Sequence, residues 1–173
     1  MYEKVLNKYA VKQVGYVVDD LEDACVKMAE TVGAGPFVSM LDYSPAKAEC
    51  KGRPVDIVLD QAYGAYGDVQ IEVIAKPTKG DEAIFDRTGF HHFAIWVDDV
   101  DEAVEEFKKA GFDVALQMES QNGLRIFFID CRDVLGHYIE LYNPQEGLFN
   151  MNQQLAENWD GQKAYMTMAE ARS

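Results

Sequence analysis

Length, composition and charge describe an acidic globular chain. The 173 residues include 48% hydrophobic and 12% aromatic side chains, enough to bury the core of one domain, which argues against a disordered chain. Sixteen basic and 30 acidic residues give a formal net charge of −14, spread along the whole sequence. A surface of this sign repels phosphate backbones and anionic membranes, so neither nucleic acid nor membrane is expected as a partner.

The cysteines and the N-terminal residues indicate a cytoplasmic protein. Cys25, Cys50 and Cys131 are too few and too scattered for a disulfide framework, and they suit buried positions in a reducing compartment. The first residues, MYEKVLNKYAVKQ, lack an apolar stretch of signal-peptide length. No apolar run in the sequence is long enough to cross a bilayer.

Two segments of the chain repeat the same pattern. Residues 13–24 read QVGYVVDDLEDA and residues 92–103 read HFAIWVDDVDEA. Each pattern predicts a strand that leads through an Asp-Asp pair, suited to a helix N-terminus, into an amphipathic helix. The helices are expected over residues 21–32 and 100–110, each followed by glycine, a common helix C-terminal residue.

Three strand-like runs follow each predicted helix. They are expected at residues 37–41, 55–59 and 69–75, and again at 113–118, 125–129 and 138–142. The closing runs also match each other, QIEV against YIEL, and a proline follows both. The sequence therefore predicts an α+β fold, in which two βαβββ modules form a curved mixed sheet around a cleft.

One domain accounts for most of the chain. We expect one domain over residues 1–147, with module one at 11–77, a linker at 78–90 and module two at 91–146. The linker contains proline, glycine and charged residues, with room for one helical turn. Residues 148–173 lie outside the repeat and predict an amphipathic helix that packs on the domain or on a second subunit, or acts as a lid.

Alternation along the strands separates residues beneath the helices from residues in the cleft. Apolar side chains fall on the helix side, and His91 falls there too, as a structural residue. Four polar side chains fall on the cleft side at equivalent places in the repeat, one on each opening strand and one on each closing strand: Gln13, Glu72, His92 and Glu140.

These four residues predict a metal site. Two carboxylates that face each other inside a sheet need a compensating charge, and a divalent cation supplies it. One imidazole, two carboxylates and one amide oxygen suit zinc, nickel, cobalt or manganese, with iron less favoured. A purely structural buried histidine is the alternative interpretation. The spacing to the following proline differs between the modules, which leaves Gln70 as an alternative ligand to Glu72.

The same alternation predicts a pocket around this site. Its expected lining residues are Gln70, Trp96, Tyr138 and Tyr142, with Tyr16 and Tyr63 as further candidates. An anionic substrate needs a basic anchor at the cleft mouth, for which the sequence offers Lys51, Arg53, Lys76 and Arg125.

The motifs resemble those of the vicinal oxygen chelate superfamily, which contains glyoxalase I, methylmalonyl-CoA epimerase, extradiol dioxygenases and bleomycin resistance proteins. The resemblance covers residues 11–146, and GFHHFAIWVDDVD is similar to the corresponding epimerase segment. It implies metal ligands at Gln13, Glu72, His92 and Glu140, where Gln13 replaces the commoner histidine, and it implies a homodimer.

The resemblance also implies a function. We expect a metal-dependent isomerase, epimerase or lyase that transfers a proton next to a carbonyl through a metal-stabilised enediolate. Glu140 is the first candidate for the general base and Glu72 the second. The alternative is a non-catalytic protein that binds a drug or an aromatic small molecule. An extradiol dioxygenase fits less well, because its iron needs two histidines and one carboxylate.

Overall fold

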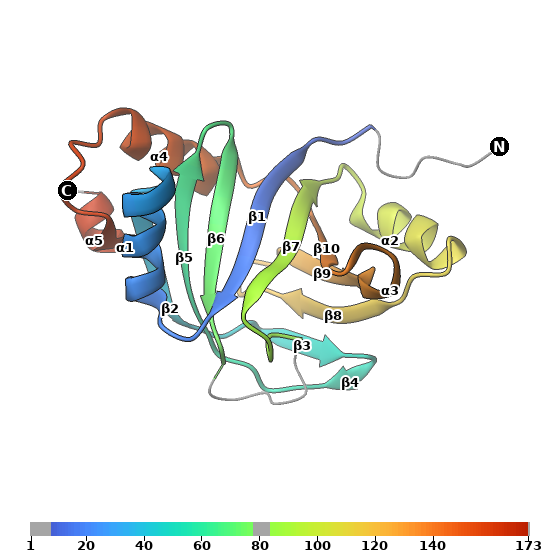
Figure 1. The fold of residues 1–173 in the computed structure, drawn as a ribbon. Helices are drawn as coiled ribbons and strands as arrows, with labels where there is room; N and C mark the ends of the chain where they lie inside the picture. Colours follow the sequence, from blue (N-terminus) through green and yellow to red (C-terminus); the bar gives the residue numbers. More distant parts are fainter. Residues whose placement is uncertain (1–7, 78–83, 173) are drawn as a thin grey trace.

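The computed structural model describes residues 8–77 and 84–172 (Figure 1). This part of the chain forms eleven strands and five helices. In chain order they are β1 (Val11–Val18), α1 (Leu21–Val32), β2 (Phe37–Tyr43), β3 (Lys47–Cys50), β4 (Arg53–Pro54), β5 (Leu59–Tyr66), β6 (Val69–Ala75), β7 (Gly89–Trp96), α2 (Val100–Lys109), β8 (Val114–Glu119), β9 (Arg125–Asp130), α3 (Arg132–Leu135), β10 (Tyr138–Tyr142), α4 (Glu146–Glu157), β11 (Tyr165–Thr167) and α5 (Met168–Ala171).

Both halves of the repeat open with the predicted strand and helix. The second aspartate of each Asp-Asp pair caps its helix: Asp20 accepts from the backbone N–H of Asp23 at 2.9 Å, and Asp99 accepts from that of Glu102 at 3.0 Å. These caps satisfy N–H groups that have no partner within the helix. The α1 helix ends at Gly33, whose φ of 70° is left-handed.

All strands belong to one curved, open mixed sheet. Their order is β11-β2-β5-β6-β1-β7-β10-β9-β8-β3-β4. At its centre β1 pairs in parallel with β6 and antiparallel with β7, which in turn pairs in parallel with β10. The two modules therefore meet at the β1–β7 pair within a single chain. The predicted α+β fold class and curved sheet are confirmed.

The prediction of a strand at residues 55–59 is wrong. The inner strand of module one is β5, which starts at Leu59, and the preceding β3–β4 hairpin pairs with β8 of the other module. The β5 sequence LDQAYGAY contains no β-branched residue, so the strand signal is weak. Gly64 lies where a Cβ would come within 2.8 Å of the Phe37 ring, which explains a glycine inside this strand.

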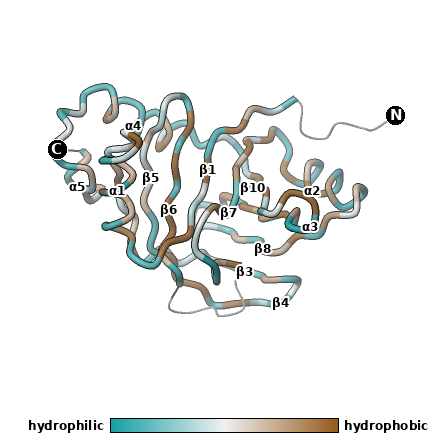
Figure 2. Tube along the Cα trace, viewed as in Figure 1, coloured by the Kyte–Doolittle hydropathy of each residue, from teal (hydrophilic) through white to brown (hydrophobic). Residues whose placement is uncertain are grey.

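Helices α1 and α2 cover the outer face of the sheet, one on each module. Ile71 and Val73 pack in the cluster that contains α1, and Ile139 and Leu141 pack in the cluster that contains α2. These residues lie on the faces that strand alternation predicts. Figure 2 shows hydrophobic stretches along strands such as β6 and hydrophilic residues along the outer turns of α2. A third cluster, which includes Phe128, packs on the inner side of the sheet.

The C-terminal extension is more than the single helix expected. After α4, which packs against β5, the chain adds β11 to the sheet edge beside β2 and ends in α5. None of the described helices is long and apolar enough to span a membrane. Of the expected linker, residues 78–83 lie outside the described residues, and Ile84 and Phe85, which follow them, are buried.

Candidate active site

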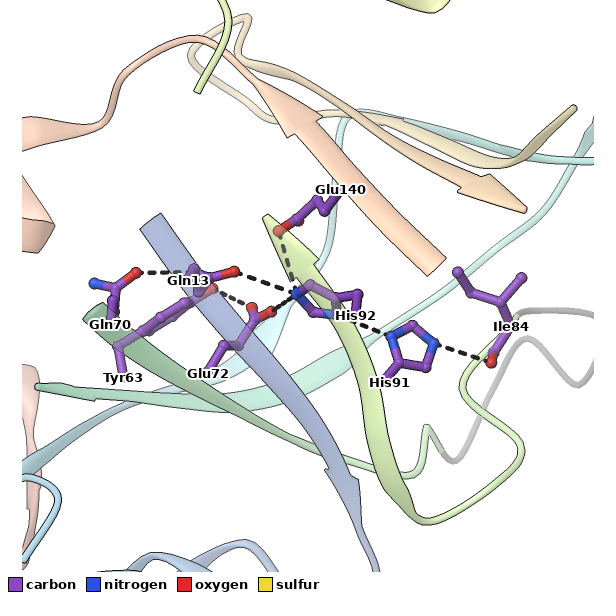
Figure 3. Close-up of polar contacts among 8 residues, drawn as sticks. All are labelled: Gln13, Tyr63, Gln70, Glu72, Ile84, His91, His92 and Glu140. Carbon is purple, nitrogen blue, oxygen red and sulfur yellow. Dashed lines mark hydrogen bonds and ion pairs between the residues drawn. The ribbon is translucent and has the colours of Figure 1, made fainter. Parts of the chain in front are cut away.

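Four buried polar side chains converge at the centre of the sheet (Figure 3). The Nε2 atom of His92 lies 3.2 Å from Oε2 of Glu72, 3.3 Å from Oε2 of Glu140 and 3.3 Å from Oε1 of Gln13. Gln13 and Glu72 come from β1 and β6 of module one, whereas His92 and Glu140 come from β7 and β10 of module two. The structure thus brings together all four residues predicted as ligands, across the β1–β7 pair.

Strand register explains how His92 reaches Glu72. His92 lies opposite Gly15 on β1, and Gly15 lies beside Glu72 on β6. Because Gly15 has no side chain, the imidazole extends over the β1 backbone toward the carboxylate. A Cβ built on Gly15 would lie 1.9 Å from Cε1 of His92.

Register also places Glu140 and Gln13 on either side of one small residue. Ala94 on β7 pairs with Glu140 on one side and with Gln13 on the other. This small, fully buried residue leaves space for the two longer side chains to approach above it.

The donor set fits a divalent cation. The Oε2 atoms of Glu72 and Glu140 are buried and have no hydrogen-bond partner, although both lie within ion-pair distance of His92. One imidazole N–H cannot satisfy two carboxylates and an amide oxygen together. The ligand atoms of Glu72, His92 and Glu140 all lie within 4.8 Å of one another, so one ion can contact all three.

The surroundings of the cluster shift the pKa values of His92 and Glu140. Burial lowers the pKa of His92, but the charges and hydrogen-bonding oxygens of Glu140 and Glu72 outweigh burial and raise it to about 9. Burial raises the pKa of Glu140 to about 6, against the opposing effect of protonated His92. A carboxyl group with a pKa near neutrality is suited to general base chemistry.

His91 does not lie on the helix side as expected. A register shift between β1 and β7 lets His91 share the inner side with His92, and its Nδ1 lies 2.9 Å from Nδ1 of His92. Burial is the main cause that lowers the pKa of His91 to about 3, so its ring is neutral. Its Nε2 must donate to the backbone oxygen of Ile84, 3.3 Å away, because that oxygen only accepts. Nδ1 of His91 therefore accepts from His92, whose Nε2 is directed at the cluster.

Gln70, the alternative ligand to Glu72, lies in a different place. Its Oε1 accepts from Nε2 of Gln13 at 2.8 Å and its Nε2 donates to Asn152, so its hydrogen bonds are directed away from His92. Glu72 is held in place by the hydroxyl group of Tyr63, which donates to its Oε1 at 2.8 Å. Burial, followed by the charge of Glu72, raises the pKa of Tyr63 well above its ordinary value, so this donor keeps its proton.

A cavity of about 270 Å³ opens over the cluster. Of the predicted lining residues, Gln70, Trp96 and Tyr142 do line it, and so does Tyr63. Tyr138 does not line it; it lies against His91, with ring centroids 4.8 Å apart. The remaining wall is mostly apolar, with Met40, Leu59, Ile74, Met118, Ile126 and Phe128, together with Leu148 of the C-terminal extension.

No lysine or arginine occurs among the described residues that line this cavity. Of the four basic residues considered as anchors, Arg125 is bound to Asp101 and Lys76 to Asp19. Lys51 and Arg53 are exposed around the β3–β4 turn. The described part of the cavity wall therefore offers an anionic substrate no charged partner.

Sequence reasoning missed three residues that shape the site. Gly15 could have been identified from the sequence, because a glycine inside a strand often marks the close approach of another group. Tyr63 was considered for the pocket but not as a partner of Glu72. Asn152 of α4 is fully buried and contacts both Gln70 and Tyr63, and only its polarity on an amphipathic helix hinted at such a role.

The fold and the site define a class: two βαβββ modules in one open sheet, with a buried histidine-carboxylate cluster between them. A sequence profile described as the Glyoxalase/Bleomycin resistance protein/Dioxygenase superfamily matches residues 12–128. The chain belongs to this superfamily. No curated protein sequence matches it significantly.

Solved structures share the fold at low sequence identity. A hypothetical protein, BH1468, from Bacillus halodurans C-125 is 17% identical with a TM-score of 0.55, over 80% of this chain and 96% of the other. The methylmalonyl-CoA epimerase from Mycobacterium tuberculosis is 22% identical with a TM-score of 0.51, over 80% of this chain and 89% of the other. At these identities the similarity concerns the fold alone.

Proposed function

We propose that the protein is a divalent-cation-dependent isomerase, epimerase or lyase that transfers a proton next to a carbonyl group. The observation that carries the proposal is the convergence of two hydrogen-bond-deficient carboxylate oxygens and one amide oxygen on Nε2 of His92. Gln13, Glu72, His92 and Glu140 would hold the cation, with zinc, nickel, cobalt and manganese as the candidates. When bound, it supplies a Lewis acid that stabilises negative charge on a substrate oxygen.

The two glutamates are not equivalent, and Glu140 is better placed to move a proton. Tyr63 occupies one oxygen of Glu72 with a hydrogen bond. The Oε2 atom of Glu140 has no hydrogen-bond partner among the described residues and lies only within ion-pair distance of His92. Burial raises the pKa of Glu140 to about 6, toward the range that suits a general base. Glu140 is therefore the proposed base, and Glu72 the proposed structural ligand.

The cavity wall indicates the substrate class. Its apolar side chains exclude water from the carboxylates, and Gln61, Ser120, Asn122 and Gln145 offer neutral polar groups to a substrate. The described wall has no basic residue, and the charge of a divalent cation would be offset by Glu72 and Glu140, so an anionic substrate would find no net positive partner there. We infer a compact, uncharged carbonyl compound as the substrate.

The test combines metal content with proton exchange. Protein purified without a metal-binding tag should contain about one zinc, nickel, cobalt or manganese ion per chain by mass spectrometry. Glu140→Ala should lose both the ion and activity. Glu140→Gln keeps an oxygen at the site but cannot accept a proton, so it should retain much of the ion and lose the exchange of α-protons for deuterium in neutral carbonyl compounds. Failure of every ion to bind would overturn the proposal.

Binding without catalysis is the second candidate, favoured by the mostly apolar cavity and its aromatic residues Trp96 and Tyr142. Tight binding of a hydrophobic ligand by protein that a chelator has freed of metal (chelated protein), with no deuterium exchange in either form, would favour it. The expected homodimer stays a prediction. All four proposed ligands come from one chain, so the site does not require a second copy.

A further inference from the structure

Asn152 links the C-terminal helix α4 to the interior of the sheet. Its side chain is 0% exposed, although it lies beyond the segment that matches the superfamily profile. Its Nδ2 donates to the backbone oxygen of Tyr63 at 3.0 Å, and its Oδ1 accepts from Nε2 of Gln70 at 2.7 Å. The contact with Gln70 is buried and the contact with Tyr63 is partly buried, so the first in particular is not easily exchanged for one with water.

These contacts continue to the candidate metal site as a chain of three amides. The Oε1 atom of Gln70 accepts from Nε2 of Gln13 at 2.8 Å, and Oε1 of Gln13 lies 3.3 Å from Nε2 of His92 (Figure 3 shows this end of the chain). Each side-chain amide thus donates away from the site and directs its oxygen toward it. The oxygen of Gln13, the last of the three, is the one that reaches the site.

The donor-to-acceptor direction of this chain of amides is set at the end farthest from the metal site. The backbone oxygen of Tyr63 can only accept, so Asn152 must place its NH2 group there. The oxygen of Asn152 then faces Gln70, which must present its own NH2 group. The same logic leaves the oxygen of Gln70 for the NH2 group of Gln13. Reversing any one amide would set two donors or two acceptors against each other in a buried place.

This direction matters because the two ends of an amide have opposite polarity. An oxygen of Gln13 can ligate a cation, whereas an NH2 group at the same position would repel it. Without neighbours that distinguish the two ends, a glutamine side chain has little reason to prefer one orientation. The amide chain supplies that preference before any ion arrives.

We propose that Asn152, acting through Gln70, is a positioning residue that holds the oxygen of Gln13 toward the metal site. Helix α4 is then part of the site's construction and not only a cover for the sheet. The inference rests on the proposed function for the identity of the ligand, but the orientation of Gln13 can be measured without any metal.

The first arm measures cation affinity. Chelated wild-type protein, Asn152→Leu, Asn152→Asp and the control Asn150→Asp, on the exposed side of the same helix, are titrated calorimetrically with zinc and with cobalt. Asn152→Leu removes the acceptor that orients Gln70, so its Kd should rise about 10- to 100-fold, as for other residues that orient metal ligands. Asn152→Asp still accepts from Gln70, so its Kd should stay near that of Asn150→Asp.

Thermal unfolding separates positioning from a general loss of stability. Both Asn152 variants lose the donor to Tyr63, so both should have a lower Tm than wild type. If the role of Asn152 is merely structural, their affinities will fall together with their Tm values. Weakened binding in Asn152→Leu alone supports the proposal, and equal Kd values for Asn152→Leu and wild type overturn it.

The second arm needs no metal. In chelated wild-type protein, NMR should show the side-chain NH2 protons of Gln13 close to Gln70 and slow to exchange with solvent. In Asn152→Leu the same protons should exchange faster. Contacts from the NH2 protons of Gln13 to the His92 ring in wild type would mean a reversed chain and overturn the proposal. If the chain is found as described but no ion binds, the proposed metal function fails while the amide chain stands.

Discussion

The imidazole of His92 fills the space that a side chain on Gly15 would need: a Cβ on residue 15 would lie 1.9 Å from Cε1 of the ring. The backbone of Gly15 does not have the positive φ that requires glycine, so its role is to leave room. A side chain at this position and the present orientation of His92 exclude each other.

We therefore predict that Gly15→Ala displaces the imidazole and dismantles the cluster. Overpacking of this kind costs about 1–3 kcal/mol of unfolding free energy. Urea unfolding and metal analysis check it, and both stability and cation content should fall. Gly147→Ala is the matched control, because a Cβ there meets nothing within 4 Å and alanine favours the helix. A Gly15→Ala protein with wild-type cation content would contradict the prediction.

Tyr63 should affect the site through Glu72. Tyr63→Phe removes the O–H group that donates to Oε1 of Glu72 and leaves a buried carboxylate oxygen with one partner fewer. We expect cation affinity to fall about 10-fold, as for other groups that orient a metal ligand. Calorimetric titration measures it. Tyr66→Phe, at an exposed position on the same strand, should bind like the wild type; equal weakening in both variants would assign the effect to the strand.

The chelated protein should become less stable as the pH rises from about 6.5 to 9. His92 has a pKa raised to about 9 in the folded chain, against 6.5 as its ordinary value, so the folded state holds the proton more tightly. The stabilisation that comes from this proton is complete below pH 6.5 and is lost as the pH rises through 9. Urea unfolding in a chelator checks the slope, which should be shallower in His92→Gln. Identical slopes in the two proteins would count against it.

Cation uptake should release a proton at pH 7.5. The protonated imidazole of His92 cannot ligate, so binding must remove its proton. Calorimetry in buffers of different ionisation enthalpy counts the released protons. Gln13→Ala, which keeps His92, should release the same number despite weaker binding. Binding with no proton release would show that His92 is already neutral.

Ligands in the cavity should be visible by fluorescence. The chain has two tryptophans, and Trp96 lines the cavity whereas Trp159 does not. A neutral carbonyl compound or aromatic ligand should change the emission of the wild type and of Trp159→Phe, but barely that of Trp96→Phe. A response carried by Trp159 would place the ligand outside the cavity.

The sequence predicted the fold and the candidate ligands because both depend on short-range patterns. The repeat located the modules, and alternation placed Gln13 and His92 on the inner side. The sequence did not predict the features that depend on contacts between elements far apart in the chain. The register shift that turns His91 inward has no local signal. Strand β5 lacks β-branched residues, and the role of Asn152 depends on where α4 docks.

The cluster is divided evenly between the modules, with two side chains from each half of the chain, across the β1–β7 pair. An ion held by all four would therefore act as a noncovalent cross-link between the two halves of the repeat. Its binding free energy would add to that of the strand pair, since a ligand that binds only the folded state stabilises it. Hydrogen exchange at the backbone amides of β1 and β7 would then slow when the ion is added, including at amides that contact no ligand.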